Sequence, residues 1–272
     1  MCIEDILATA AQAWPMIWLL DLLRYLLGVA AVAAVLDLAS QRWLAPRSVR
    51  IRTVAQDQRW KEFLRSLRTV VVFSAVGTTV FLGYRLGLNR FYEAPGEYGW
   101  TWLVASFPVL LVLHDAWFYW THRLLHHRKV FTGVHRTHHL SVAPTVWTAY
   151  AFSVPEAFVQ ALFLPVVLLV VPLHSSVVFA WLLWMVLRNV MGHSGMELLP
   201  RRWLAGWWGR WMTTTLHHEM HHAYGHTNYG LYFTWWDRWC GTEHPAYASR
   251  LAQLVGDLGD GKPSPRPAAT AR

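Results

Sequence analysis

Five long apolar segments organise most of this chain. A helix that crosses a bilayer needs about 20 mostly apolar residues, and the segments 14–39, 67–88, 100–120, 153–172 and 174–190 approach that length. The last two are separated by a short turn around Pro172–His174 and are expected to form a helical hairpin, in which Pro165 kinks the first arm. The pattern predicts an all-α integral membrane protein built as a multi-span helical bundle.

The first apolar segment contains two charged residues, Asp21 and Arg24. They are three residues apart, so on a helix they can pair and reduce the cost of placing each charge in a membrane. Before Arg24 the chain has Glu4 and Asp5 but no lysine or arginine. Because it lacks the positive start of a signal peptide, we expect this segment to be retained as an anchor.

Composition and charge agree with a membrane protein. Of the 272 residues, 54% are hydrophobic and only 15% are charged, where soluble domains average about 25% charged. The net charge of +8 could suggest nucleic-acid binding, but eight of the 24 lysines and arginines lie in residues 39–68, between two apolar segments. Such an excess marks a cytoplasmic loop, so we expect no nucleic-acid partner. The two cysteines define no disulfide framework.

The histidines divide the chain. All 15 lie between His114 and His244, and the same topology places nearly all of them on the cytoplasmic side. We therefore expect N-terminal anchor helices with the basic loop at 1–104, a histidine-rich domain at 105–245, and a disordered tail at 246–272, whose end is dominated by Gly, Pro, Ala and Ser.

The spacing of the histidines indicates metal binding. H-x3-H at 122–126 puts two imidazoles on one helical face, and H-x-x-H-H occurs at both 135–139 and 218–222. Imidazole is the commonest neutral nitrogen ligand for iron, zinc and copper. Together with a histidine just after the fifth segment, the clusters provide nine candidate ligands: His122, His126, His135, His138, His139, His193, His218, His221 and His222.

Nine ligands are too many for one ion, since a tetrahedral site takes about four and an octahedral site about six. Two metal ions are therefore predicted, held by cytoplasmic helices. His127 is an alternative to His126, and Glu197 and His217 are possible extra ligands. Asp115 is expected to orient a histidine of another helix as an outer carboxylate. A nitrogen-rich pair of irons suits O2 activation, and the surrounding apolar segments imply a lipid substrate.

The three clusters resemble the histidine boxes of the fatty acid hydroxylase/sterol desaturase superfamily. The resemblance covers about residues 105–245 and includes further matching segments: His114-Asp115 with Phe118-Tyr119-Trp120 and His122-Arg123, Pro144-Thr145 with Trp147-Thr148-Ala149, Asn228-Tyr229-Gly230, and Trp236-Asp237-Arg238 with Gly241-Thr242. It implies a membrane-bound enzyme with two non-haem iron ions and O2 as co-substrate, which hydroxylates or desaturates a lipid such as a sterol or a fatty acyl chain.

The sequence contains no Gly-rich phosphate loop for a nicotinamide or flavin, so electrons must come from another protein. The resemblance implies a b-type cytochrome or a ferredoxin with its reductase.

Two other hypotheses compete with a lipid oxygenase. His218-Glu219-x-x-His222 also matches a zinc metalloprotease, but this leaves the other clusters without a role. The second alternative is a bis-histidine haem protein. A haem needs only two axial ligands, which does not explain the paired H-x-x-H-H clusters.

Overall fold

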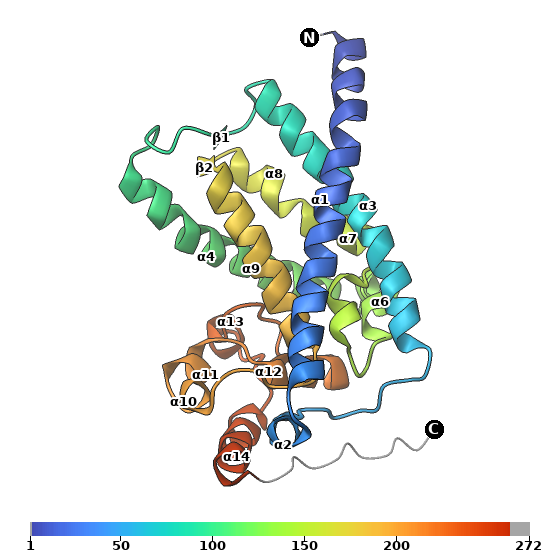
Figure 1. Ribbon diagram of the computed structural model, residues 1–272, viewed down its shortest axis with the longest axis vertical. Helices are drawn as coiled ribbons and strands as arrows, with labels where there is room; N and C mark the ends of the chain where they lie inside the picture. Colours follow the sequence, from blue (N-terminus) through green and yellow to red (C-terminus); the bar gives the residue numbers. More distant parts are fainter. Residues whose placement is uncertain (1, 262–272) are drawn as a thin grey trace.

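The computed structural model describes residues 2–261. Within them, four helices are long and apolar enough to cross a membrane. They stand together as a bundle, with α1 the longest (Figure 1). Their bounds are α1 Ile3–Leu38, α3 Gln58–Arg85, α4 Trp100–Leu125 and α9 Ser175–His193. The prediction of an all-α membrane protein with a multi-span bundle is confirmed.

The expected span at 153–172 is the exception. This segment forms two short helices, α7 (Val154–Ala161) and α8 (Phe163–Leu168). At about 1.5 Å per residue, they are too short for a 30 Å hydrocarbon core. Pro165 lies in α8 and lacks the backbone N–H that a regular helix uses. The prediction of a full-length helix here is wrong.

The hairpin topology of this segment is nevertheless present. The Ser153 hydroxyl, just before α7, donates to the Val134 carbonyl near the histidines. At the far end of α8, the Leu168 carbonyl accepts from Arg90 N. There, strand β1 (Phe91–Tyr92) pairs in parallel with β2 (Leu173–His174), immediately before α9 returns. The chain therefore runs the length of the bundle and back.

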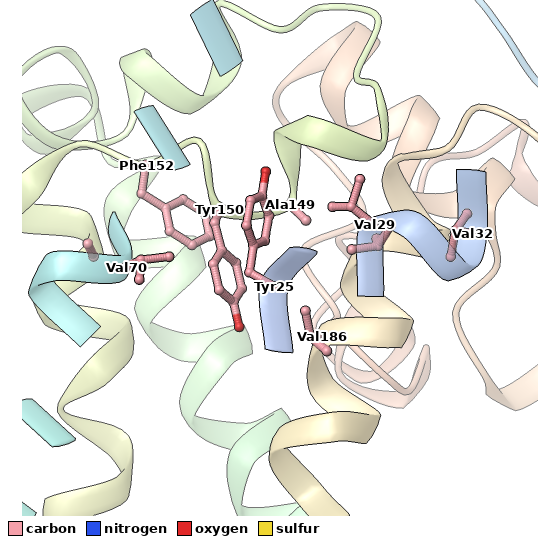
Figure 2. Close-up of a cluster of buried hydrophobic side chains, with 10 residues drawn as sticks. Tyr25, Val29, Val32, Val70, Ala149, Tyr150, Phe152 and Val186 are labelled. Atoms are coloured by element: carbon pink, nitrogen blue, oxygen red, sulfur yellow. The ribbon is translucent and has the colours of Figure 1, made fainter. Parts of the chain in front are cut away.

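Aromatic and branched side chains hold α1 against α3 and α9. Tyr25 of α1 stacks on Tyr150, with ring centroids 5.0 Å apart, at the centre of a buried cluster (Figure 2). Gly28 lets the backbone of α1 approach Val186 of α9, because a Cβ there would lie 3.2 Å from that side chain. Asp21 and Arg24 form the predicted ion pair at 2.9 Å.

The basic segment after α1 folds onto the histidine-bearing half. It contains α2 (Gln41–Leu44) and a 3-10 turn, η1 (Ala45–Arg47). The Arg47 guanidinium donates to the carbonyls of Glu197 and Leu199, and Val49 N donates to Gly195 O. Arg47 is one of the basic residues from which the sequence predicts the topology. In the structure it also connects the segment after α1 to the residues that follow α9.

Short helices gather at the end of the bundle that carries the histidine clusters (Figure 1). They are α5 Arg128–Val134, α6 Arg136–His139, η2 Val146–Tyr150, α10 Arg201–Leu204, α11 Trp207–Trp211, α12 Thr215–Tyr224 and α13 Trp235–Trp239. Thr214 begins α12 with its hydroxyl accepting from His217 N, and Gly225 ends it in a left-handed conformation (φ 75°). These caps fix the length of the helix that carries the last histidine cluster.

The chain continues as a helix where the sequence predicts a disordered tail. Helix α14 (Tyr247–Asp260) buries Tyr247, Leu251 and Leu254 against Leu216 and Met220 of α12. Their spacing places the three apolar residues on one helical face. The prediction of disorder from residue 246 is therefore wrong for 247–260. Residues 262–272 lie outside the described part of the chain.

Candidate metal centre

The nine predicted histidines come together as two adjacent groups. In each group the candidate ligand atoms all lie within 4.8 Å of one another. The five-histidine group contains His122, His126, His135, His139 and His221, and the four-histidine group contains His138, His193, His218 and His222. The structure therefore assembles two clusters, as expected for two ions, and divides the second and third sequence boxes between them.

The five-histidine group joins three parts of the chain. His122 lies in the last turn of α4 and His126 directly follows that helix, so the two share a face as the sequence predicts. His122 Nε2 lies 3.1 Å from His135 Nε2, which is also 3.1 Å from His139 Nε2. His221 Nε2, from α12, lies 3.1 Å from His139 Nε2. The group is thus held by α4, α6 and α12.

The four-histidine group uses the other edge of α6 and α12. His193 Nε2, at the end of α9, lies 2.9 Å from His218 Nε2 and 3.4 Å from His138 Nε2. His222 Nε2 lies 3.2 Å from His218 Nε2. His218 and His222 are four residues apart on α12, whereas His221 points to the other group. One helix therefore supplies ligands to both groups.

In four imidazoles, the contact made by the outer nitrogen, Nδ1, determines which ring nitrogen carries the lone pair. Each Nδ1 contacts a backbone carbonyl, which can only accept a hydrogen bond, so Nδ1 carries the proton and Nε2 the lone pair. These contacts are His122 with Tyr229 O (2.9 Å), His193 with Asn189 O (2.7 Å), His221 with Thr227 O (2.7 Å) and His222 with Ser141 O (2.9 Å). All four Nε2 lone pairs point into the groups, where a bound cation would satisfy them.

Burial keeps these imidazoles neutral. Desolvation, and next the charge of neighbouring imidazoles, lowers the pKa of His139 to about 3. The same two causes hold other pKa values well below the usual histidine range, those of His135, His138, His218, His221 and His222. Neutral imidazole is the form that binds a metal, so the site is prepared for a cation at physiological pH.

A carboxylate that sequence reasoning missed contacts the five-histidine group. Glu156 Oε1 lies 2.6 Å from His135 Nδ1, and both side chains are buried. A carboxylate on the outer nitrogen orients a ligating imidazole and makes it more basic. The sequence does contain a signal for it, because Glu156 is an acidic residue within an apolar segment.

Asp115, the predicted outer carboxylate, has a different role. Its carboxylate accepts from Tyr232 N at 2.7 Å, Phe233 N at 3.2 Å and Trp235 Nε1 at 3.1 Å. It therefore fixes the loop before α13 and orients no histidine of the two groups. The prediction for Asp115 is wrong, because the N–H groups of that loop already occupy its carboxylate.

The possible extra ligands fall outside both groups. His127 instead caps α5, accepting from Lys129 N. His217 Nε2 lies 3.3 Å from Asp237 Oδ2, with both side chains fully buried. Glu197 accepts from Leu199 N and Thr215 N. Each of these three side chains therefore contacts groups other than the nine candidate ligands.

Glu219, the predicted base of the protease alternative, faces the basic segment. Its carboxylate accepts from Ile51 N at 3.1 Å and lies 3.3 Å from Arg50 Nη1. Burial raises the pKa of Glu219 to about 7, against the opposing effect of Arg50. Since His218 and His222 also share their group with two further histidines, the protease reading is not supported.

The loop beside the five-histidine group is anchored by Asp237. Its carboxylate accepts from Tyr229 N and Gly230 N, both at 2.8 Å, and from the Thr242 hydroxyl at 2.7 Å. Tyr229 in turn presents its carbonyl to His122. Asp237 therefore acts on the group indirectly, by holding the backbone that orients one of its imidazoles.

A cavity of about 260 Å³ lies in the bundle beside the two histidine groups. It is lined mainly by apolar side chains of α1, α3, α4 and α9, and it reaches Phe152. The Phe152 ring lies 5.1 Å from that of His138, and the ring of Phe118, which also lines the cavity, lies 4.9 Å from that of His122. A smaller cavity shares Asn189 and Leu231 with the first and extends to His218. The apolar space thus adjoins the histidines.

Comparison with known proteins gives the family of this chain. A Delta(7)-sterol 5(6)-desaturase of Gibberella zeae is 31% identical over 182 residues, which cover 67% of this chain and 55% of that protein. A Delta(7)-sterol 5(6)-desaturase of Aspergillus fumigatus is 32% identical over 202 residues (67% and 62%). The lathosterol oxidase of Mus musculus is 30% identical over 192 residues (68% and 62%).

The matched regions thus span little more than half the length of these relatives. No solved structure matches this chain. The sequence profile of the fatty acid hydroxylase family matches residues 107–242, which is half of the chain and includes all nine candidate ligands. This chain therefore belongs to the fatty acid hydroxylase family.

Proposed function

We propose that this protein is an O2-dependent, non-haem di-iron oxidoreductase that hydroxylates or desaturates a membrane lipid in lipid biosynthesis. The observation that carries the proposal is the pair of buried histidine groups with their Nε2 lone pairs directed inward. A second support is the apolar cavity beside the four-histidine group.

In this proposal each group holds one iron, and the nine histidines are the ligands. Bound iron would pass the donor's electrons to O2 and so activate it for attack on an unactivated C–H bond. Hydroxylation consumes O2, two electrons and two protons, inserts one oxygen atom into the C–H bond and releases one water. Desaturation removes two hydrogens from adjacent carbons with the same inputs and releases two waters.

The chain's own residues provide the setting for this chemistry. Backbone carbonyls and Glu156 hold the outer imidazole nitrogens, so that the ligands need not reorganise when iron binds. The apolar cavity would place the lipid chain beside the histidine groups and exclude water from them. The names of the relatives favour a sterol among the open substrate classes.

We further propose that the histidine groups face the cytoplasm. The basic segment 39–68 folds beside them and supports this orientation. The two electrons would come from a b-type cytochrome or from a ferredoxin with its reductase. An acidic carrier of this kind would be attracted to the positively charged face by charge complementarity.

Lipidomics of cells grown in 18O2, with and without the active protein, tests the activity. Label in one lipid indicates hydroxylation, whereas a loss of two hydrogens without label indicates desaturation. The control expresses His135→Ala, which removes one proposed ligand. If the lipids of cells with the wild-type protein and with His135→Ala are identical, the proposal is wrong.

A further inference from the structure

The cavity that adjoins the four-histidine group contains polar side chains that the proposed chemistry does not use. Asp21, Arg24, Tyr150 and Gln160 all line it among apolar residues. We refer to these four as the polar subsite. Asn189 also lines the cavity, but its amide is occupied, because it donates to Ala149 O at 2.8 Å. The polar subsite is different, because parts of it have no protein partner.

The ion pair of the polar subsite is costly at its position. Asp21 and Arg24 lie within the apolar part of α1, where charged residues are expensive and usually serve a function. Their pairing at 2.9 Å offsets both charges. It leaves Arg24 Nε buried, with no hydrogen-bond acceptor among residues 2–261. A buried N–H without an acceptor is a position where a ligand oxygen would be stabilised.

Tyr150 offers a second polar group to the cavity. Its ring is stacked on Tyr25, but the two hydroxyls point in opposite directions (Figure 2). The Tyr25 hydroxyl donates to Trp147 O at 3.1 Å. The Tyr150 hydroxyl lies beside Arg24 and is buried without a well-formed hydrogen bond within the described chain. Gln160 Oε1 is a buried acceptor that likewise has no hydrogen-bond donor within residues 2–261.

We propose that the polar subsite binds the hydroxyl group of an uncharged lipid alcohol while its apolar skeleton fills the cavity. This inference rests on the proposed lipid-oxidising function and names the substrate class. A hydroxyl both accepts and donates, and the subsite offers a donor at Arg24, an acceptor at Gln160, and Tyr150, which can do either. A fatty acid carboxylate fits less well, because Asp21 already neutralises Arg24 and would repel a second anion.

The position of the cavity allows such a lipid to enter from the bilayer. Leu20 of α1 and Phe179 of α9 line the cavity and are also 47% and 60% exposed on the outside of the bundle. The polar subsite lies on α1, η2 and α7. Of its four residues, Asp21 and Arg24 precede the segment 107–242 that the family profile matches. Tyr150 and Gln160 lie within that segment, so the first helix would supply only part of the hydroxyl contact.

Binding of lipid pairs that differ only by a hydroxyl tests the proposal. Tritiated cholestanol and cholestane form one pair, and hexadecan-1-ol and hexadecane form another, each measured on the full-length protein in nanodiscs and corrected with empty nanodiscs. We expect the wild type to prefer the alcohol by about tenfold or more in at least one pair, as expected for a buried hydrogen bond. No preference in either pair would overturn the proposal, as would tighter binding of hexadecanoate than of hexadecan-1-ol.

Matched variants locate the effect. Tyr150→Phe should reduce the alcohol preference severalfold, and Asp21→Leu/Arg24→Met, which removes both charges together, should bring it close to one. Tyr25→Phe removes a hydroxyl from the same aromatic stack on the opposite side and should leave the preference unchanged. Asp57→Asn/Lys61→Gln, at an exposed ion pair of α3, is the control for the double variant. If Tyr25→Phe and Tyr150→Phe have equal effects, the subsite is not where we place it.

Failure of this inference can be separated from failure of the proposed function. Iron content and lipid oxidation are measured on the same wild-type preparations. Iron-loaded, active protein without an alcohol preference would overturn the subsite alone. Protein that prefers the alcohol but contains no iron and oxidises no lipid would support the subsite and contradict the proposed di-iron chemistry.

Discussion

The two histidine groups use the same side chain but have different surroundings. The five-histidine group includes His135, which pairs with the buried carboxylate of Glu156. In the four-histidine group, the outer nitrogens of His193 and His222 contact neutral carbonyls. The four-histidine group contacts Phe152 and the five-histidine group contacts Phe118, and both of these rings line the apolar cavity. Equal sequence spacing therefore does not produce equal sites: a buried carboxylate orients one imidazole of the five-histidine group, although both groups contact rings that line the cavity.

The largest expected effect comes from removing one ligand of either group. We expect His135→Ala and His193→Ala each to reduce lipid oxidation at least a thousandfold, because the proposed chemistry needs both ions. The measurement is product formation per purified protein. The comparison predicts equal loss in both variants. Substantial activity in only one of them would mean that its group is not needed for the reaction.

A smaller and selective effect is expected at Glu156. Glu156→Gln keeps the shape but removes the charge that orients His135, and the loss of such a partner costs about 10- to 100-fold in metal affinity. The competition of a chelator for bound iron measures this affinity. One of the two ions should be released more readily and the other should be unaffected. Equal weakening of both ions would contradict the assignment of Glu156 to the five-histidine group.

The smallest effect is expected at Glu219, which contacts neither group through its carboxylate. Glu219→Gln keeps an acceptor for Ile51 N but loses the charge opposite Arg50. We expect activity within about threefold of the wild type and a loss of about 1–3 kcal/mol in stability, typical for a buried group that loses its partner. Thermal unfolding and lipid oxidation measure the two. Abolished activity in stable, iron-loaded protein would show that Glu219 has a direct role.

Much of this site could be predicted from the sequence because helical periodicity is local. The pairs at 122–126 and 218–222 lie on one face of a helix in the structure, as their spacing requires. How His138 and His139 divide between the two groups could not be predicted. That division depends on the approach of α9 and α12 to α6, which residue spacing along one segment does not contain.

The structure differs from the sequence prediction in three further features. Glu156 is 21 residues from its partner His135, and only its position in an apolar segment gave a signal. For α14, composition suggested disorder, whereas the spacing of Tyr247, Leu251 and Leu254 agreed with an amphipathic helix. Arg50 seemed to be a topology signal, but its guanidinium is engaged by Ser194 O and Glu219. Long-range partners of this kind appear only once the chain has folded.

Iron counting in the purified protein shows whether each histidine group holds one ion. We expect about two non-haem iron ions per wild-type chain, with no Soret absorption, and about one in each of His135→Ala and His193→Ala. The ion that remains should differ between the two variants in its Mössbauer spectrum, since the two groups have different ligands. A wild-type protein with one iron, or variants that keep two, would contradict the assignment of one ion to each histidine group.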